Sequence, residues 1–176
     1  MGELMFRGSA DARIDEKGRL KIPSKFRSLL VDSFGPEVFV TSYGPPSMRV
    51  YPLGEWVKLE DSLRKSGWGD EPRVVQFLRT VGLYGDVQEV DPQGRILIHS
   101  RLRKHVRMEG DVVVLGNPTN FLEVWNEDLL NEIQAKEPLT EETIRFVSNI
   151  LREARNGNGI PPCPGDGPGG GGGPSG

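Results

Sequence analysis

The stretch Ile14-Asp15-Glu16-Lys17-Gly18-Arg19-Leu20-Lys21-Ile22-Pro23 occurs a second time in altered form, as Val90-Asp91-Pro92-Gln93-Gly94-Arg95-Ile96-Leu97-Ile98-His99. With an offset of 76, positions 15–27 and 91–103 share six identities in 13 positions. A repeat of this quality sets the architecture before any single element does, because each copy should fold as the same unit. The chain therefore reads as two copies of one module, each built around Asp-x-x-Gly-Arg.

A second pair of strands follows the motif in both copies. Residues 37–40 match residues 111–114, and residues 48–51 match residues 122–125, both with an offset of 74. The repeat divides the chain into a first module over 1–85 and a second over 86–155. Gly, Pro and Asn dominate residues 156–176, so we expect this tail to be disordered, because it cannot build a core.

The first copy predicts short strands on both sides of the Asp15–Gly18 turn, followed by a short helix that ends near Leu30. An Asp before a turn can accept hydrogen bonds from the backbone N–H groups that follow, and Gly tolerates a positive φ. Asp15 and Gly18 are thus expected to organise the first turn, and Asp91 and Gly94 the second. The remaining strands of the first copy are expected over 37–42 and 48–51.

Amphipathic patterns predict a helix pair after each set of strands. The expected helices are 53–65, 71–82, 126–135 and 140–155. In the helix over 71–82, we expect the side chains of Val74, Phe77, Leu78 and Val81 to face the core. The last begins with Thr140 and two acids, and carries the apolar stripe Ile144, Val147, Ile150 and Leu151. The aromatic residues Trp56, Phe77, Trp125 and Phe146 have the spacing of core residues.

Charge is distributed unevenly along the chain. The totals are 22 basic and 25 acidic residues, a net charge of −3, yet residues 1–30 and residues 89–107 each carry +3. The two copies of the motif are therefore basic patches on an otherwise acidic chain. Local patches of this kind are typical of surfaces that bind nucleic acid. Each patch has the size of a two-stranded ribbon, which fits a DNA major groove.

Catalysis, cofactors and membranes find no support in the sequence. There is no nucleophile elbow, no phosphate-binding Gly-rich loop and no cluster of metal ligands, so we expect no enzyme activity, no metal and no cofactor. His99 and His105 do not share a helix face and are expected to be surface or packing residues. The single cysteine, Cys163, allows no disulfide framework within one chain, and no apolar run approaches a membrane span. These features favour a cytoplasmic protein.

From the residues alone, two interpretations of the turns stay open. Either each turn is a solvated hairpin, or the pair binds nucleic acid, with Arg reading guanine and the flanking basic residues contacting phosphates. The recurrence of the same Arg in both copies favours the second interpretation.

The chain closely resembles the MraZ family, within the AbrB/MazE-like superfamily of swapped-hairpin DNA-binding proteins. The resemblance rests on Met5-Phe6-Arg7-Gly8, the two Asp-x-x-Gly-Arg motifs, and Gly116 with Phe121-x-Glu123-Val124-Trp125. It implies an α+β fold in which tandem swapped-hairpin modules form a pseudo-two-fold β-barrel flanked by helix pairs. It also implies a nucleoid-associated repressor of the bacterial division and cell-wall operon. Such a repressor binds short upstream direct repeats of double-stranded DNA as a ring-shaped homo-oligomer.

By the same resemblance, the arginines of the motifs contact DNA and the aspartates organise the turns. The predicted DNA-binding residues are Arg19, Lys17, Arg95, Arg13, Lys21 and Lys25. Gln93 stands where the first turn has Lys17, so the second turn is expected to bind DNA less strongly. The alternative is an antitoxin-like or scaffold protein that acts mainly through contacts with other proteins.

Overall fold

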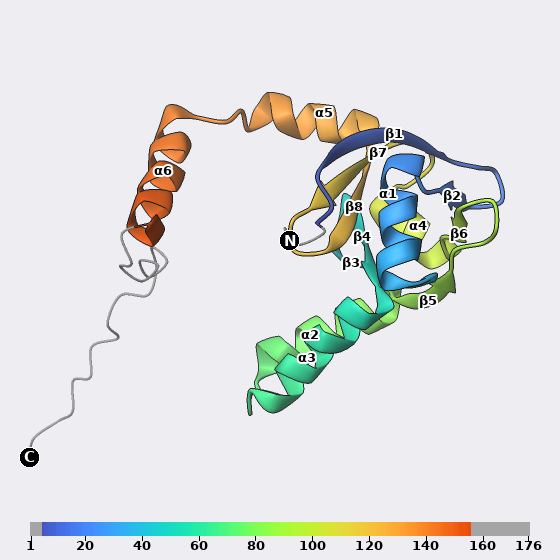
Figure 1. The fold of residues 1–176 in the computed structure, drawn as a ribbon, viewed down its shortest axis with the longest axis horizontal. Helices are drawn as coiled ribbons and strands as arrows, with labels where there is room; N and C mark the ends of the chain where they lie inside the picture. The colour runs from blue at the N-terminus through green and yellow to red at the C-terminus, as the bar shows by residue number, and fades with distance from the viewer. Residues whose placement is uncertain (1–4, 156–176) are drawn as a thin grey trace, which may run out of the picture. The chain divides into compact units, whose positions relative to one another are not determined.

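The computed structural model describes residues 5–155, and its first unit, which ends at Glu132, is built on an eight-stranded antiparallel sheet (Figure 1). The strands are β1 (Gly8–Ile14), β2 (Arg19–Lys21), β3 (Glu37–Gly44), β4 (Ser47–Pro52), β5 (Asp86–Glu89), β6 (Arg95–Leu97), β7 (Gly110–Asn117) and β8 (Phe121–Asn126). Their order is β5-β3-β4-β8-β7-β1-β2-β6, and the sheet curls into a nearly closed barrel. The two end strands, β5 and β6, are consecutive in the chain.

The two copies exchange strands across the barrel. β1 pairs with β7 along its whole length, from Gly8 opposite Gly116 to Ile14 opposite Gly110, and β5 pairs with β3 in the same way. Within the first copy, β1 and β2 share only the Ile14–Leu20 pair, because β2 pairs mainly with β6 of the second copy. The swapped-hairpin α+β barrel expected from the resemblance is therefore confirmed, inside a single chain.

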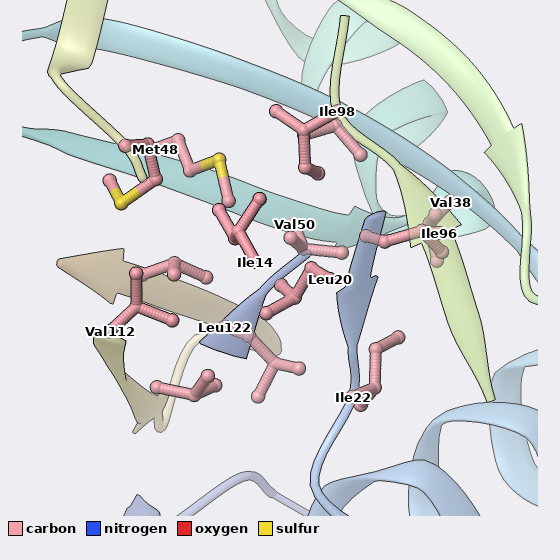
Figure 2. Close-up of a cluster of buried hydrophobic side chains, with 14 of the residues drawn as sticks. Ile14, Leu20, Ile22, Val38, Met48, Val50, Ile96, Ile98, Val112 and Leu122 are labelled. Atoms are coloured by element: carbon pink, nitrogen blue, oxygen red, sulfur yellow. The ribbon is translucent and has the colours of Figure 1, made fainter. Parts of the chain in front are cut away.

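One hydrophobic core fills the barrel, and both copies contribute to it (Figure 2). Leu20 of β2 faces Ile96 of β6, and each is only 1% exposed. The cluster also includes Ile14, Ile22, Val38, Met48, Val50, Ile98, Val112 and Leu122. Burying an aliphatic side chain of this kind contributes about 1.5–3 kcal/mol. Because the members come from both copies, the copies share this core.

A short helix follows each turn motif and packs side chains into the core. α1 (Ser24–Leu29) buries Phe26, and α4 (Ser100–Val106) buries Leu102 and Val106. The sequence predicted that the first helix ends near Leu30. Instead the chain continues as a π-helical turn, η1 (Leu30–Phe34), before Gly35. The extension carries Phe34 onto the ring of Phe6, 5.8 Å away between ring centres, so packing explains the longer helix.

The first helix pair covers a second, smaller core. α2 (Leu53–Lys65) and α3 (Pro72–Tyr84) pack on β3, and α2 also packs on β4. Trp56 stacks on Phe39 with 4.4 Å between ring centres, next to Tyr51, Val81 and Phe121. The sequence predicted that α3 buries Leu78, but this side chain is 39% exposed, because α3 turns Val81 toward the sheet.

The second helix pair consists of α5 (Glu127–Lys136), which crosses the boundary between the two units, and α6 (Glu141–Arg155). The predicted start of α6 is confirmed, because the Oγ1 of Thr140 accepts a hydrogen bond from the backbone N–H of Thr143. Its apolar stripe is exposed, with Ile144 at 50% and Leu151 at 55%. The expectation that Phe146 is a core residue is wrong, since it is 47% exposed.

Residues 156–176, expected to be a disordered tail, lie outside the described residues. Over residues 5–155, each helix is too short or too polar to cross a bilayer.

Candidate nucleic-acid interface

The first turn is organised by the carboxylate of Asp15. Its Oδ1 accepts hydrogen bonds from the backbone N–H groups of Lys17 and Arg19, at 3.0 and 2.9 Å. Gly18 closes the turn by donating its N–H to the carbonyl of Asp15, and it adopts a φ of +78° that other residues rarely take. The sequence folds this way locally because a short acceptor begins the turn and a glycine ends it.

The same carboxylate holds the arginine of the motif. Oδ2 of Asp15 accepts from Nε of Arg19 at 2.8 Å and lies 2.7 Å from its Nη2. These contacts, led by the hydrogen bond from the Arg19 side chain, lower the pKa of the Asp15 carboxyl. The guanidinium is therefore fixed beside the turn before any ligand arrives, and its Nη1 amine stays available for one.

The second turn repeats this geometry. Asp91 accepts from the backbone N–H groups of Gln93 and Arg95, both at 2.9 Å, and from Nε of Arg95 at 2.9 Å. The backbone N–H of Arg95, and then its side chain, lower the pKa of the Asp91 carboxyl. Gly94 also has a φ of +78°. The two turns are thus equivalent in backbone and differ in their side chains.

Backbone hydrogen bonds lock each turn to the other copy. The carbonyl of Gly18 accepts from the N–H of Ile98, and the carbonyl of Gly94 accepts from the N–H of Ile22, both at 2.8 Å. Since β2 and β6 run antiparallel, the turns lie at opposite ends of this three-residue ladder. Each turn is therefore held in place by residues of both copies.

A hollow of about 660 Å³ lies beside the first turn. It brings together the predicted site residues Arg13, Lys17 and Arg19, with Arg103 of α4. Arg13 also forms an ion pair with Asp111 on the neighbouring strand, at 2.6 Å, and both side chains are largely exposed. Asp15, Glu16 and Glu109 line the hollow as well, so its charge is mixed.

The other predicted cations lie elsewhere. Lys21 lines a neighbouring hollow of about 550 Å³ together with Arg13 and Arg27, and it pairs with Arg95 across the β2–β6 ladder. Lys25 is not near the turn. Its Nζ donates to the carbonyl of Ser9, toward the start of β1, 3.2 Å away.

The sequence placed Arg27 and Arg103 among the basic residues that follow each turn, but they were not selected as site residues. An ideal Cβ placed on Gly18 would lie 2.6 Å from Cζ of Arg103, and one placed on Gly94 would lie 2.7 Å from Cδ of Arg27. Each arginine thus lies across the turn glycine of the other copy. The signal was available, because Arg27 and Arg103 are one of the six identities of the repeat.

Comparisons with known proteins point to one family. The family model described as "MraZ protein, putative antitoxin-like" matches residues 5–76 and 86–149. A protein of Acidobacterium capsulatum named transcriptional regulator MraZ is 38% identical over 138 residues, 78% of this chain and 93% of the relative. The chain belongs to the MraZ family.

Two further MraZ relatives carry the same name. The one from Koribacter versatilis is 38% identical over 148 residues, 83% of this chain and 99% of the relative. The one from Neisseria meningitidis is 35% identical over 124 residues, 70% of this chain and 82% of the relative. Both turns lie within the segments that the MraZ family model matches, so the similarity covers the candidate site itself.

Proposed function

We propose that the chain is a sequence-specific DNA-binding transcriptional repressor that acts in the cytoplasm, at the nucleoid. The observation that carries the proposal is the pair of rigid Asp-x-x-Gly-Arg turns at the ends of one two-stranded ladder. A ribbon of this width fits the major groove, and a guanidinium held in place by a carboxylate loses little entropy on binding.

In this mode the first turn reads bases and its neighbours contact phosphates. Arg19 enters the groove and reads bases. Lys17, at the tip of the turn, enters the same groove segment and meets a phosphate at its edge, while Arg13 and Lys21 meet the backbone on either side. Lys25 lies about five residues of strand away from the turn, roughly 17 Å, so it would contact a phosphate of another DNA segment. Arg95 binds more weakly, because Gln93 replaces the lysine of the first turn.

Ring-shaped homo-oligomers would place several such turns along short direct repeats, and avidity would then raise the affinity for the repeated site. Exposed apolar surface supports an assembly of this kind. α6 exposes Ile144, Phe146 and Leu151, and Trp68 lines an apolar hollow of about 490 Å³ between α2 and α3. The proposed target, following the family resemblance, is the promoter of the bacterial division and cell-wall operon.

The same exposed stripe on α6 favours the second candidate, an antitoxin-like or scaffold protein whose main partner is another protein. The two functions differ in what Arg19 does. A repressor needs this residue to bind DNA, whereas a scaffold that binds through α6 does not.

Fluorescence anisotropy with a labelled duplex of the upstream repeats tests the proposal. Replacing Arg19 by Ala should weaken binding by about 5- to 150-fold, the range for loss of one bidentate base contact. Arg95→Ala makes the same change at the second turn and should have a smaller effect. Arg64→Ala removes an exposed charge on α2 and should have none. Unchanged binding by Arg19→Ala would refute the proposed mode.

Salt provides a second measure of the same contact. A complex with about 6–10 phosphate contacts should lose roughly 10³–10⁵ in affinity between 50 and 200 mM salt. An affinity that does not change over this range would contradict binding through the basic residues around the turns.

A further inference from the structure

The guanidinium of Arg103 lies flat against the first turn, although this residue belongs to the second copy. A Cβ on Gly18 would lie 2.6 Å from its Cζ and Nε and 2.9 Å from its Nη2, closer than real Cβ atoms approach other atoms. Only a glycine leaves room for this contact. The close approach requires glycine in addition to the positive φ of the turn.

Ile98 fixes both partners of the contact. Its N–H donates to the carbonyl of Gly18 at 2.8 Å, and its carbonyl accepts from Nε of Arg103 at 3.0 Å. The arginine and the turn are therefore held by two groups of the same residue. This leaves the terminal nitrogens of Arg103 with no hydrogen-bond acceptor anywhere in residues 5–155.

The cations around the hollow differ in whether a carboxylate already holds them. Arg13 is paired with Asp111, and Arg19 is paired with Asp15. Lys17 and Arg103 also line the hollow, and neither forms an ion pair within the described part of the chain. These two side chains, one from each copy, are the cations of the hollow that no carboxylate holds.

We propose that Arg103, together with Lys17, binds a phosphate of the DNA backbone beside the first turn. The inference rests on the proposed function and adds a residue to it. The site is composite, because the strand exchange brings the helix of one copy onto the turn of the other. Arg103 supplies charge and position and reads no base, since a phosphate carries no sequence information.

The second turn does not offer an equivalent site. Arg27 lies over Gly94 as Arg103 lies over Gly18, but Gln93 replaces the tip lysine. Glu89 occupies the repeat position of Arg13, and it faces Glu37 across the β3–β5 pair, where Arg13 faces Asp111. Two facing acids repel a phosphate. Each chain thus presents one turn with a composite phosphate site and one turn that binds DNA more weakly.

Anisotropy titrations at several salt concentrations test this assignment with Arg103→Gln, which keeps an N–H donor at the place of Nε and removes the charge. The expected result is a slope of log affinity against log salt that falls by about 1 in magnitude. Binding should weaken by the same factor on the repeat duplex and on an unrelated duplex, so the ratio of the two affinities stays constant. A purely structural role would leave the salt slope unchanged, because the slope counts phosphate contacts.

Arg27→Gln is the matched control at the second turn and should leave the slope unchanged. Lys17→Gln, on an exposed turn tip, should reproduce the effect of Arg103→Gln and keeps the test valid if the latter variant unfolds. If the wild type binds the repeats and both first-turn variants retain its slope, the inference fails and the proposed function stands. If Arg27→Gln lowers the slope equally, the asymmetry is refuted. If the wild type binds no DNA, both are refuted.

Discussion

Gly18 and Gly67 offer a matched pair for measuring what the first turn requires of its glycine. Both have a positive φ, +78° and +77°, so an alanine at either position pays the cost of left-handed backbone, about 1–2 kcal/mol. The surroundings differ. Nothing lies within 4 Å of a Cβ on Gly67, whereas a Cβ on Gly18 would overlap Arg103. The difference between the two variants therefore isolates the contact with Arg103.

The overlap at Gly18 must displace the Arg103 guanidinium and break its hydrogen bond to the carbonyl of Ile98. Losing such a bond costs about 0.5–1.5 kcal/mol. We expect Gly67→Ala to lose about 1–2 kcal/mol and Gly18→Ala about 1.5–3.5 kcal/mol of unfolding free energy. For a domain of this size each kcal/mol lowers the Tm by roughly 2–4 °C.

Urea unfolding followed by tryptophan fluorescence gives both free energies, and anisotropy gives DNA affinity. Gly18→Ala should weaken DNA binding because Arg103 leaves its place, and Gly67→Ala should not. Equal unfolding free energies for the two variants, together with equal DNA affinity, would refute the role assigned to the contact.

Three further outcomes are expected. The pKa values of the Asp15 and Asp91 carboxyls are lowered by folding, so both groups stabilise the fold at pH values above the unfolded-state pKa of about 3.9. The urea midpoint should therefore fall as pH drops below about 4. The fall should be less steep in Asp15→Asn, which lacks one of these carboxyls. Leu20→Ala should cost about 2–5 kcal/mol in urea unfolding, and its combination with Ile96→Ala should deviate from additivity, because the two side chains face each other. Phe146→Ser should lower the molar mass measured by light scattering if α6 joins subunits, and an unchanged mass would contradict this.

The local structure of both turns follows from their own residues. Asp15 accepts the N–H groups that a turn exposes, and Gly18 takes the φ that a β-carbon disfavours, so the sequence was sufficient to predict them. The strands and helices also lie close to the predicted ranges, because hydrophobic periodicity acts over a few residues. The two departures from the predicted elements depend on contacts between residues that are not neighbours in the chain. Phe34 extends the first helix by packing on Phe6, and the orientation of α3 leaves Leu78 exposed.

Strand exchange cannot be deduced from hydrophobic alternation. A strand with one apolar face shows the same pattern whichever strand lies beside it, so β1 could have paired within its own copy. It was the resemblance to a family with swapped hairpins that suggested the exchange. In the structure, β1 pairs with β7 and β2 with β6, and this choice places α4 beside the first turn.

The sequence by itself determined the two turns, their basic surroundings and the loss of a cation at the second turn. Each depends on the identity of neighbouring residues. Only the tertiary structure decided that Arg103 completes the first turn, that Lys25 lies away from it, and that Glu89 faces Glu37. These are contacts between residues far apart in the chain, and they depend on strand pairing that the local sequence does not specify.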